Sequence, residues 1–270
     1  MVRLTNQQQE DLYKQKLKEV NIANINTQEI MDEILPNWED IEAQNDIVFS
    51  NMLIFGFQGS GKSLSADWII NQAEKKYGKE NVNAIRSRYP YRIIQAIENK
   101  KVNILVFEDA TLRKISDDEL LDFFNVRHIA KERGTLKIGY ILNIINIHDF
   151  YSVKKVMRTT FDFMILCSSP TNQYDFNAFS KFTGKEILRT FMSLQKLKRK
   201  FRIFKRLKVF WYLGSSGYME TGIPSEGFEV RNLDNEVVIL MYRRGMSVRN
   251  QLLIVGFILL IWFIIISQTF

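Results

Sequence analysis

The stretch Gly56-Phe57-Gln58-Gly59-Ser60-Gly61-Lys62-Ser63 directly follows an apolar run, 51–55, and marks the first strand-to-helix turn of the fold. Its glycines allow the backbone to curl until several N–H groups point at one anion, and the next helix adds the positive end of its dipole. Lys62 is expected to reach the β- and γ-phosphates of a nucleotide, and the Ser63 hydroxyl to bind Mg²⁺. The sequence therefore predicts a nucleoside triphosphate site held by Gly56, Gln58, Gly59, Ser60, Gly61, Lys62 and Ser63.

Around this turn, apolar strand-like runs alternate with helical patterns, which is typical of a mostly parallel sheet with helices on both faces. Pro90 suits the first turn of a helix, and Ser116 with Glu119 forms a capping box. Gly78 and Gly134 are expected to end helices. The predicted strands are 47–55, 82–86, 102–107, 138–145 and 161–167, and the predicted helices are 62–77, one from Pro90, 117–133 and 150–158.

Composition divides the chain into four segments. The first is rich in Gln, Glu, Lys and Asn, with apolar residues at loose helical spacing, which predicts two short helices ending near Pro36. After the core, a helix over about 176–200 leads through a basic run into a β-hairpin that turns on a Gly/Ser loop, 214–217. The predicted segments are N-terminal helices at 1–46, an α/β phosphate-loop core at 47–170, a basic helix and β-hairpin extension at 171–248, and a transmembrane helix at 250–268.

Two acids, Glu108 and Asp109, directly follow the buried strand 102–107. Hydrolysis of a nucleoside triphosphate needs a carboxylate near Mg²⁺ and a group that activates or positions water. We expect Glu108 to join Ser63 at the metal and Asp109 to act on water, or the two roles to follow the reach of the side chains rather than their order.

Polar residues near the end of the fourth predicted strand are candidates for a phosphate sensor. Asn146 is expected to lie between the two acids and the γ-phosphate, with Asn143 the alternative if the strand ends early. Transition-state charge usually needs an arginine, often from a neighbouring subunit, and Arg133 and Arg158 are the candidates. His148 is equally compatible with an ordinary surface histidine and with a ligand.

These features together resemble the additional-strand ATPases of the FtsK/HerA group. The resemblance rests on 127–134 (RHIAKERG), the apolar strand that ends in a polar amide, 154–158 (KKVMR) and the Asp-containing strand 161–167 (FDFMILC). It covers roughly residues 48–225. It implies a ring-forming ATPase that pumps DNA, in a group that includes viral genome-packaging enzymes, with Arg133 and Arg158 matching arginines that sense or complete a neighbour's site.

The chain is also similar to the Zot-type assembly ATPases of filamentous phages, which join a cytosolic phosphate-loop domain to one C-terminal membrane span. Leu252 to Ile266 is unbroken apolar sequence, and no charged side chain occurs from Asn250 to Phe270. The 21 uncharged residues would make about 31 Å of helix, just enough to span a bilayer. The alternatives are a buried core helix or a helix embedded in a partner.

Charge placement indicates which side of the membrane holds the bulk of the chain. Arg243, Arg244 and Arg249 precede the apolar segment and no basic residue follows it. By the positive-inside rule this predicts a single-pass protein with a cytoplasmic N-terminal ATPase domain, in a host cell membrane or a virion membrane.

Basic residues outnumber acidic ones by 37 to 30, and eight of them lie in the run 196–208, which has no acid. That run can bind the phosphates of DNA, bind anionic lipid, or form a solvated helix face. The lone cysteine, Cys167, excludes an internal disulfide and lies in an apolar strand, which predicts a buried thiol.

The combined features favour a membrane-anchored, ATP- and Mg²⁺-dependent DNA translocase or packaging motor of a virus, phage or mobile element, working as a homo-oligomeric ring. The alternative is an ATP-driven assembly or extrusion factor that acts on virion proteins instead of DNA. A small-molecule kinase is disfavoured because a diffusing substrate gives no reason for an anchor. A GTPase is disfavoured because no Asn-Lys-x-Asp motif follows the fourth strand.

Overall fold

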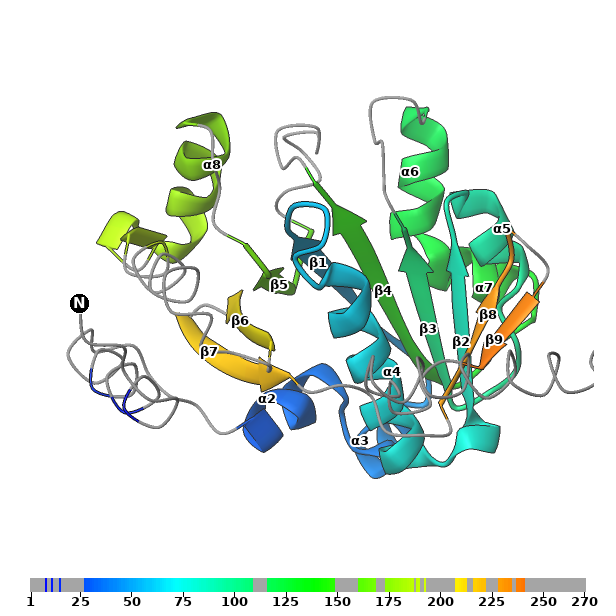
Figure 1. Ribbon diagram of the computed structural model, residues 1–270. Helices are drawn as coiled ribbons and strands as arrows, with labels where there is room; N and C mark the ends of the chain where they lie inside the picture. The colour runs from blue at the N-terminus through cyan, green and yellow to red at the C-terminus, as the bar shows by residue number, and fades with distance from the viewer. Residues whose placement is uncertain are drawn as a thin grey trace, which may run out of the picture.

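The fold is a three-layer α/β/α arrangement around one sheet (Figure 1). A computed structural model describes residues 27–108, 116–148, 160–168, 173–186, 207–212, 216–221, 228–234 and 237–240, together with 8, 11, 15, 188, 189 and 192. The helices of the described residues are α2 (Thr27–Ile34), α3 (Trp38–Gln44), α4 (Lys62–Tyr77), the 3₁₀ turn η1 (Lys79–Asn81), α5 (Pro90–Gln95), α6 (Asp117–Phe124), α7 (Val126–Glu132) and α8 (Gln173–Thr183).

The described strands form a nine-stranded sheet in the order β7-β6-β5-β1-β4-β3-β2-β8-β9. Strands β5, β1, β4, β3, β2 and β8 are parallel, and β6, β7 and β9 are antiparallel to their neighbours. Their bounds are β1 (Ile47–Phe55), β2 (Val82–Ser87), β3 (Val102–Phe107), β4 (Gly139–Ile147), β5 (Phe163–Leu166), β6 (Leu207–Tyr212), β7 (Ser216–Thr221), β8 (Glu229–Asn232) and β9 (Val237–Leu240).

The central strands are buried on both faces, as expected for a parallel sheet covered by helices. Every residue of β3 and of β4 is buried. One face packs against α2, α3 and α4 through residues such as Ile34, Ile41 and Ile69, and the other packs against α5 to α8 through residues such as Phe123 and Phe179.

Most predicted element bounds in the core agree with the structure. The predictions for β1, α4 and β3 are confirmed to the residue, and the capping box at Ser116 and Glu119 makes both of its hydrogen bonds. The predicted hairpin is confirmed as β6 and β7, and Cys167 is buried as predicted. The sequence signals for these elements lie within a few residues of each other, so the elements can be predicted without knowing which strands pair.

Other boundaries differ from the predictions. The single helix predicted over 117–133 is two helices in the structure. The backbone leaves the helical conformation at Asn125, which takes φ −100° and ψ 14° and whose N–H donates to the carbonyls of Leu121 and Asp122. Strand β4 runs on to Ile147, and α8 begins earlier than predicted. Helix α3 and strands β8 and β9 were not predicted.

Several predictions lie outside the described residues. They are most of the first N-terminal helix, the helix at 150–158, most of the basic run 196–208, and the membrane-spanning segment 250–268. Within the part of the chain that the structure describes, no helix has the length and apolar character needed to cross a bilayer.

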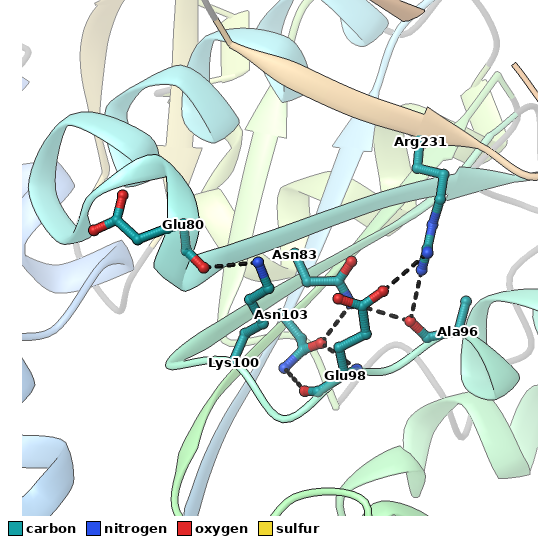
Figure 2. Close-up of polar contacts among 7 residues, drawn as sticks. All are labelled: Glu80, Asn83, Ala96, Glu98, Lys100, Asn103 and Arg231. Carbon is teal, nitrogen blue, oxygen red and sulfur yellow. Dashed lines mark hydrogen bonds and ion pairs between the residues drawn. The ribbon is translucent and has the colours of Figure 1, made fainter. Parts of the chain in front are cut away.

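A buried asparagine organises the end of the sheet at which β2 and β3 begin (Figure 2). Asn103 accepts hydrogen bonds from Asn83 Nδ2 at 2.8 Å and from the Glu98 N–H at 3.1 Å, and it donates to the Glu98 carbonyl at 3.0 Å. Arg231 of β8 donates to the same loop, at Ala96 O (3.0 Å) and Glu98 Oε1 (2.9 Å). This network therefore joins β2, β3 and the edge strand β8.

Replacing Asn103 with alanine should lower the free energy of unfolding by about 2 to 3 kcal/mol, because the loop's backbone groups and Asn83 lose their buried partner. Urea denaturation followed by circular dichroism measures the change. The matched control is Asn177→Ala on the exposed surface of α8, which should change stability by no more than about 0.5 kcal/mol. Equal stabilities for the two variants would contradict the structural role of Asn103.

Candidate nucleotide site

The loop between β1 and α4 has a conformation that favours glycine at three positions. Gly59 and Gly61 lie at φ +73° and +96°, in the left-handed region that disfavours side chains. A Cβ on Gly56 would come within 2.2 Å of Ser60 Oγ and 3.0 Å of Cys167 Cβ. The loop therefore has the left-handed glycines that a tightly curled phosphate loop needs.

Neighbouring strands hold this loop at the carboxyl edge of the sheet. The Gly56 N–H donates to Ile147 O at 3.1 Å, at the end of β4, and the Phe57 N–H donates to Ser168 Oγ at 2.9 Å, just after β5. Figure 1 shows the loop above β1, at the edge toward which β3 and β4 point. The loop is thus positioned by the strands on both sides of β1.

Lys62 is the first residue of α4 and lies almost completely buried against the loop, with 6% of its surface exposed. Its ammonium group donates to Phe57 O at 3.2 Å and lies 3.0 Å from His148 Nδ1. The side chain therefore folds back over the loop, so its ammonium group would lie close to any anion that the loop's N–H groups bind. His148 joins the site, a role that the sequence left open.

The Ser63 hydroxyl and the Glu108 carboxylate meet beside the start of α4. Ser63 Oγ donates to Glu108 Oε2 at 3.2 Å, although 45 residues separate them in the sequence. Both are oxygen donors of the kind that Mg²⁺ prefers, and Mg²⁺ in phosphate sites commonly uses only one or two protein ligands. The pair therefore fits the predicted metal position. Asp109, the second predicted acid, lies outside the described residues.

A buried charge network surrounds Glu108. Arg86 at the end of β2 pairs with Glu108, with Nε and Oε1 3.1 Å apart, and makes a short contact with Asp67 of α4. Burial raises the pKa of the Asp67 carboxyl, while the Arg86 guanidinium acts in the opposite direction. The network joins β2, β3 and α4 and restrains the Glu108 carboxylate.

Sequence reasoning missed Arg86 and Asp67. A signal was available, since Arg86 lies in a short strand next to buried residues and a charge in such a strand needs a partner. Asp67 follows Ser63 by four residues, which places both on one side of α4. What the sequence could not supply is that β2 lies beside β3, which brings the arginine to Glu108.

The two candidate sensor asparagines lie on opposite faces of β4. Asn143 donates to Asn51 Oδ1 at 3.2 Å and to Phe123 O at 2.7 Å, so it serves the face that α6 covers. Asn146 is three residues further on, so strand alternation places it on the opposite face, which α4 covers. Glu108 lies on the same face, where it accepts a hydrogen bond from Ser63 of α4. Asn146 is fully buried, and neither polar atom of its amide has a hydrogen-bond partner among the described residues. Such orphan atoms fit a group that bonds a ligand.

The two candidate arginines are placed differently. Arg133 is exposed at the end of α7, before β4 begins, and the phosphate loop lies beyond the other end of that strand. Nine residues of strand separate the two by roughly 30 Å. Arg133 therefore does not reach the site of its own chain. Arg158 lies outside the described residues.

No family model matches this chain, and no curated protein matches it. Among solved structures it is similar to the genome packaging NTPase B204 from Sulfolobus turreted icosahedral virus 2 in complex with ATP-gammaS, at 12% identity over 65% of this chain and 98% of that one, with a TM-score of 0.42. It is also similar to B204, the DNA-packaging ATPase from Sulfolobus turreted icosahedral virus, at 12% identity over 64% and 97%, with a TM-score of 0.40. At these values the likeness carries no inference about activity.

Replacing Arg86 with methionine should lower the free energy of unfolding by about 3 to 5 kcal/mol, because Asp67 is left as an uncompensated buried carboxylate. Without Arg86 the pKa of Asp67 rises further above its value in the unfolded chain. The free energy of unfolding of the variant therefore falls as the pH rises from the pKa of Asp67 in the unfolded chain to its raised pKa in the folded variant. The loss of stability relative to the wild type should be smaller at about pH 5 than at about pH 8. Urea denaturation at both pH values measures this.

Two controls isolate the buried charge. Adding Asp67→Asn to Arg86→Met should restore part of the lost stability, since no unpaired charge remains. Lys131→Met removes an exposed ion pair with Asp46 and should change stability by no more than about 1 kcal/mol. A deficit in Arg86→Met that is independent of pH would contradict the role of Asp67.

Proposed function

We propose that this chain is an ATP-hydrolysing motor that moves DNA, of the kind used in viral genome packaging. The observation that carries the ATPase part is the convergence of three groups on one loop: the glycine turn, the buried Lys62 ammonium, and the Ser63 hydroxyl bonded to Glu108. The choice of DNA as the substrate rests on the sequence resemblance to the FtsK/HerA group.

Each group has a proposed role toward a bound triphosphate. The N–H groups of the loop bind phosphate oxygens, and Lys62 moves from Phe57 O to the β- and γ-phosphates. Ser63 and Glu108 would hold Mg²⁺, which would supply the positive charge that neutralises the phosphates. Asn146 bonds the γ-phosphate or the attacking water, and Asp109 acts on that water.

The role proposed for Arg133 requires a shared site in an oligomer. Because this side chain lies at the far edge of its own sheet, the proposed role of Arg133 at a nucleotide requires the nucleotide of another subunit. Arg158 is the second candidate for the same task. A homo-oligomeric ring, in which each nucleotide lies between two subunits, is therefore part of the proposal.

We further propose that residues 250–268 anchor the motor in a membrane, with the ATPase domain on the cytoplasmic side. The alternative function is an assembly or extrusion factor that uses the same nucleotide site to remodel virion proteins. The anchor suits both functions, so DNA dependence is what separates them.

Lys62→Ala should lower the ATPase rate at least about a hundredfold, because the main cation that meets the transferred phosphate is lost. A coupled phosphate-release assay measures turnover, and calorimetry with an ATP analogue measures binding. The matched control is Lys75→Ala, an exposed lysine on the same helix, which should retain the wild-type rate. Unchanged turnover in Lys62→Ala would refute the assigned site.

DNA should stimulate ATP turnover by the full-length chain, because a motor couples hydrolysis to its track. Turnover is measured with single-stranded DNA, double-stranded DNA and no DNA across a salt series. Stimulation that weakens steeply with salt would indicate phosphate contacts. Robust turnover that neither form of DNA changes would overturn the motor and favour the assembly factor.

A further inference from the structure

An exposed aromatic and cationic surface follows the end of β2. It is made of Tyr89, Tyr91 and Arg92 and is called here the tyrosine platform. Tyr89 and Tyr91 are 48% and 45% exposed, although large aromatic rings are usually covered. Their ring centroids are 6.0 Å apart with planes tilted by 49°, and the Arg92 guanidinium carbon lies 5.0 Å from one centroid and 5.9 Å from the other.

The platform is held in place before any partner arrives. Arg92 Nε donates to the Tyr91 hydroxyl at 3.2 Å, and Nη1 donates to Leu233 O at 3.1 Å. The Tyr89 N–H donates to Ser87 Oγ at 2.9 Å, and Ser87 in turn donates to Asp234 Oδ1 at 2.6 Å. Binding here therefore costs little ordering of the protein.

The acid beside the platform also orders this loop. Asp234 lies 4.0 Å from Arg92 Nη1, and its other oxygen accepts the Arg88 N–H at 2.9 Å. Its carboxylate thus bonds Ser87 and the backbone of the loop. The rings and the guanidinium remain the groups that face outward, with Arg92 39% exposed.

The platform is connected to the nucleotide site by a short path. Ser87 O accepts the Glu108 N–H at 3.0 Å, and the preceding residue, Arg86, pairs with the Glu108 carboxylate. The platform therefore begins at Tyr89, two residues after Ser87, the last residue of β2 and the one that accepts the Glu108 N–H. A partner bound there lies at the same edge of the sheet as the phosphate loop.

We propose that the tyrosine platform binds single-stranded nucleic acid, whose unpaired bases stack on Tyr89 and Tyr91 while Arg92 contacts the backbone. Stacking of bases on exposed aromatic rings, with an arginine beside them, is how proteins hold single strands without reading sequence. The partly exposed Arg92 guanidinium beside the rings supplies the positive charge that meets a backbone phosphate. This inference rests on the proposed function and names where the motor contacts its track.

The test is fluorescence anisotropy of a labelled oligothymidine with the full-length chain, without nucleotide. Tyr89→Ala and Tyr91→Ala should each weaken binding on the order of tenfold. Tyr89→Phe should bind like the wild type, because the ring is kept. Arg92→Ala should weaken binding and lower its dependence on salt, since one phosphate contact is lost.

The matched control is Tyr174→Ala, which removes a 70% exposed tyrosine on α8 and should leave affinity unchanged. A duplex of the same length should respond less than twofold to the alanine changes, because its bases are already stacked. Unchanged single-strand affinity, or an equal loss for duplex, would overturn the proposal. So would normal binding combined with an altered oligomeric mass, which would make the platform a subunit interface.

Basal ATPase activity without nucleic acid, measured on the same variants, separates this inference from the proposed function. Wild-type turnover with lost oligothymidine binding supports both. If the wild-type chain binds the oligonucleotide through the tyrosines but has no ATPase activity, the proposed motor function is wrong and the proposed binding site is supported.

Discussion

The parallel pairing of β4 with both β1 and β3 is the constraint on which the site depends. The register sets Phe55 opposite Ile147, so β1 and β4 end together, and Phe107 opposite Ile145, so β3 ends two residues earlier at the same edge. Backbone groups buried between two layers of helices must be paired, which makes this register costly to change. The phosphate loop, Glu108 and His148 consequently project from one edge of the sheet.

Within that edge, strand alternation decides which side chains can act together. Asn143 and Asn146 are three residues apart and therefore face opposite layers, where one bonds the protein and the other has no bonding partner among the described residues. On the α4 face, Arg86 lies between the carboxylates of Asp67 and Glu108. The helix that carries Lys62 and Ser63 is thereby joined to two strands by charge as well as by packing.

The segment after the core supports this arrangement from the edges of the sheet. Strands β6 and β7 extend it beyond β5, and β8 and β9 extend it beyond β2. The turn after β8 supplies Leu233 O and the Asp234 carboxylate to the loop that carries the tyrosine platform. Residues more than 140 positions away in sequence therefore set the shape of a surface beside the nucleotide site.

The sequence by itself determined the elements whose signals are local. The glycine turn, the 16-residue helix after it, the strand before Glu108 and the capping box at Ser116 were all predictable, because each depends on residues within one or two turns of chain. The meeting of Ser63 with Glu108 was predictable because the motif implies it.

Only the tertiary structure decided which distant residues became neighbours. The pairing of β2 with β3 brought Arg86 to Glu108, and the pairing of β2 with β8 brought Asp234 to Ser87. The break at Asn125, the length of β4 and the edge strands also escaped prediction. Local propensity differs little between such alternatives, and long-range packing and strand pairing select among them.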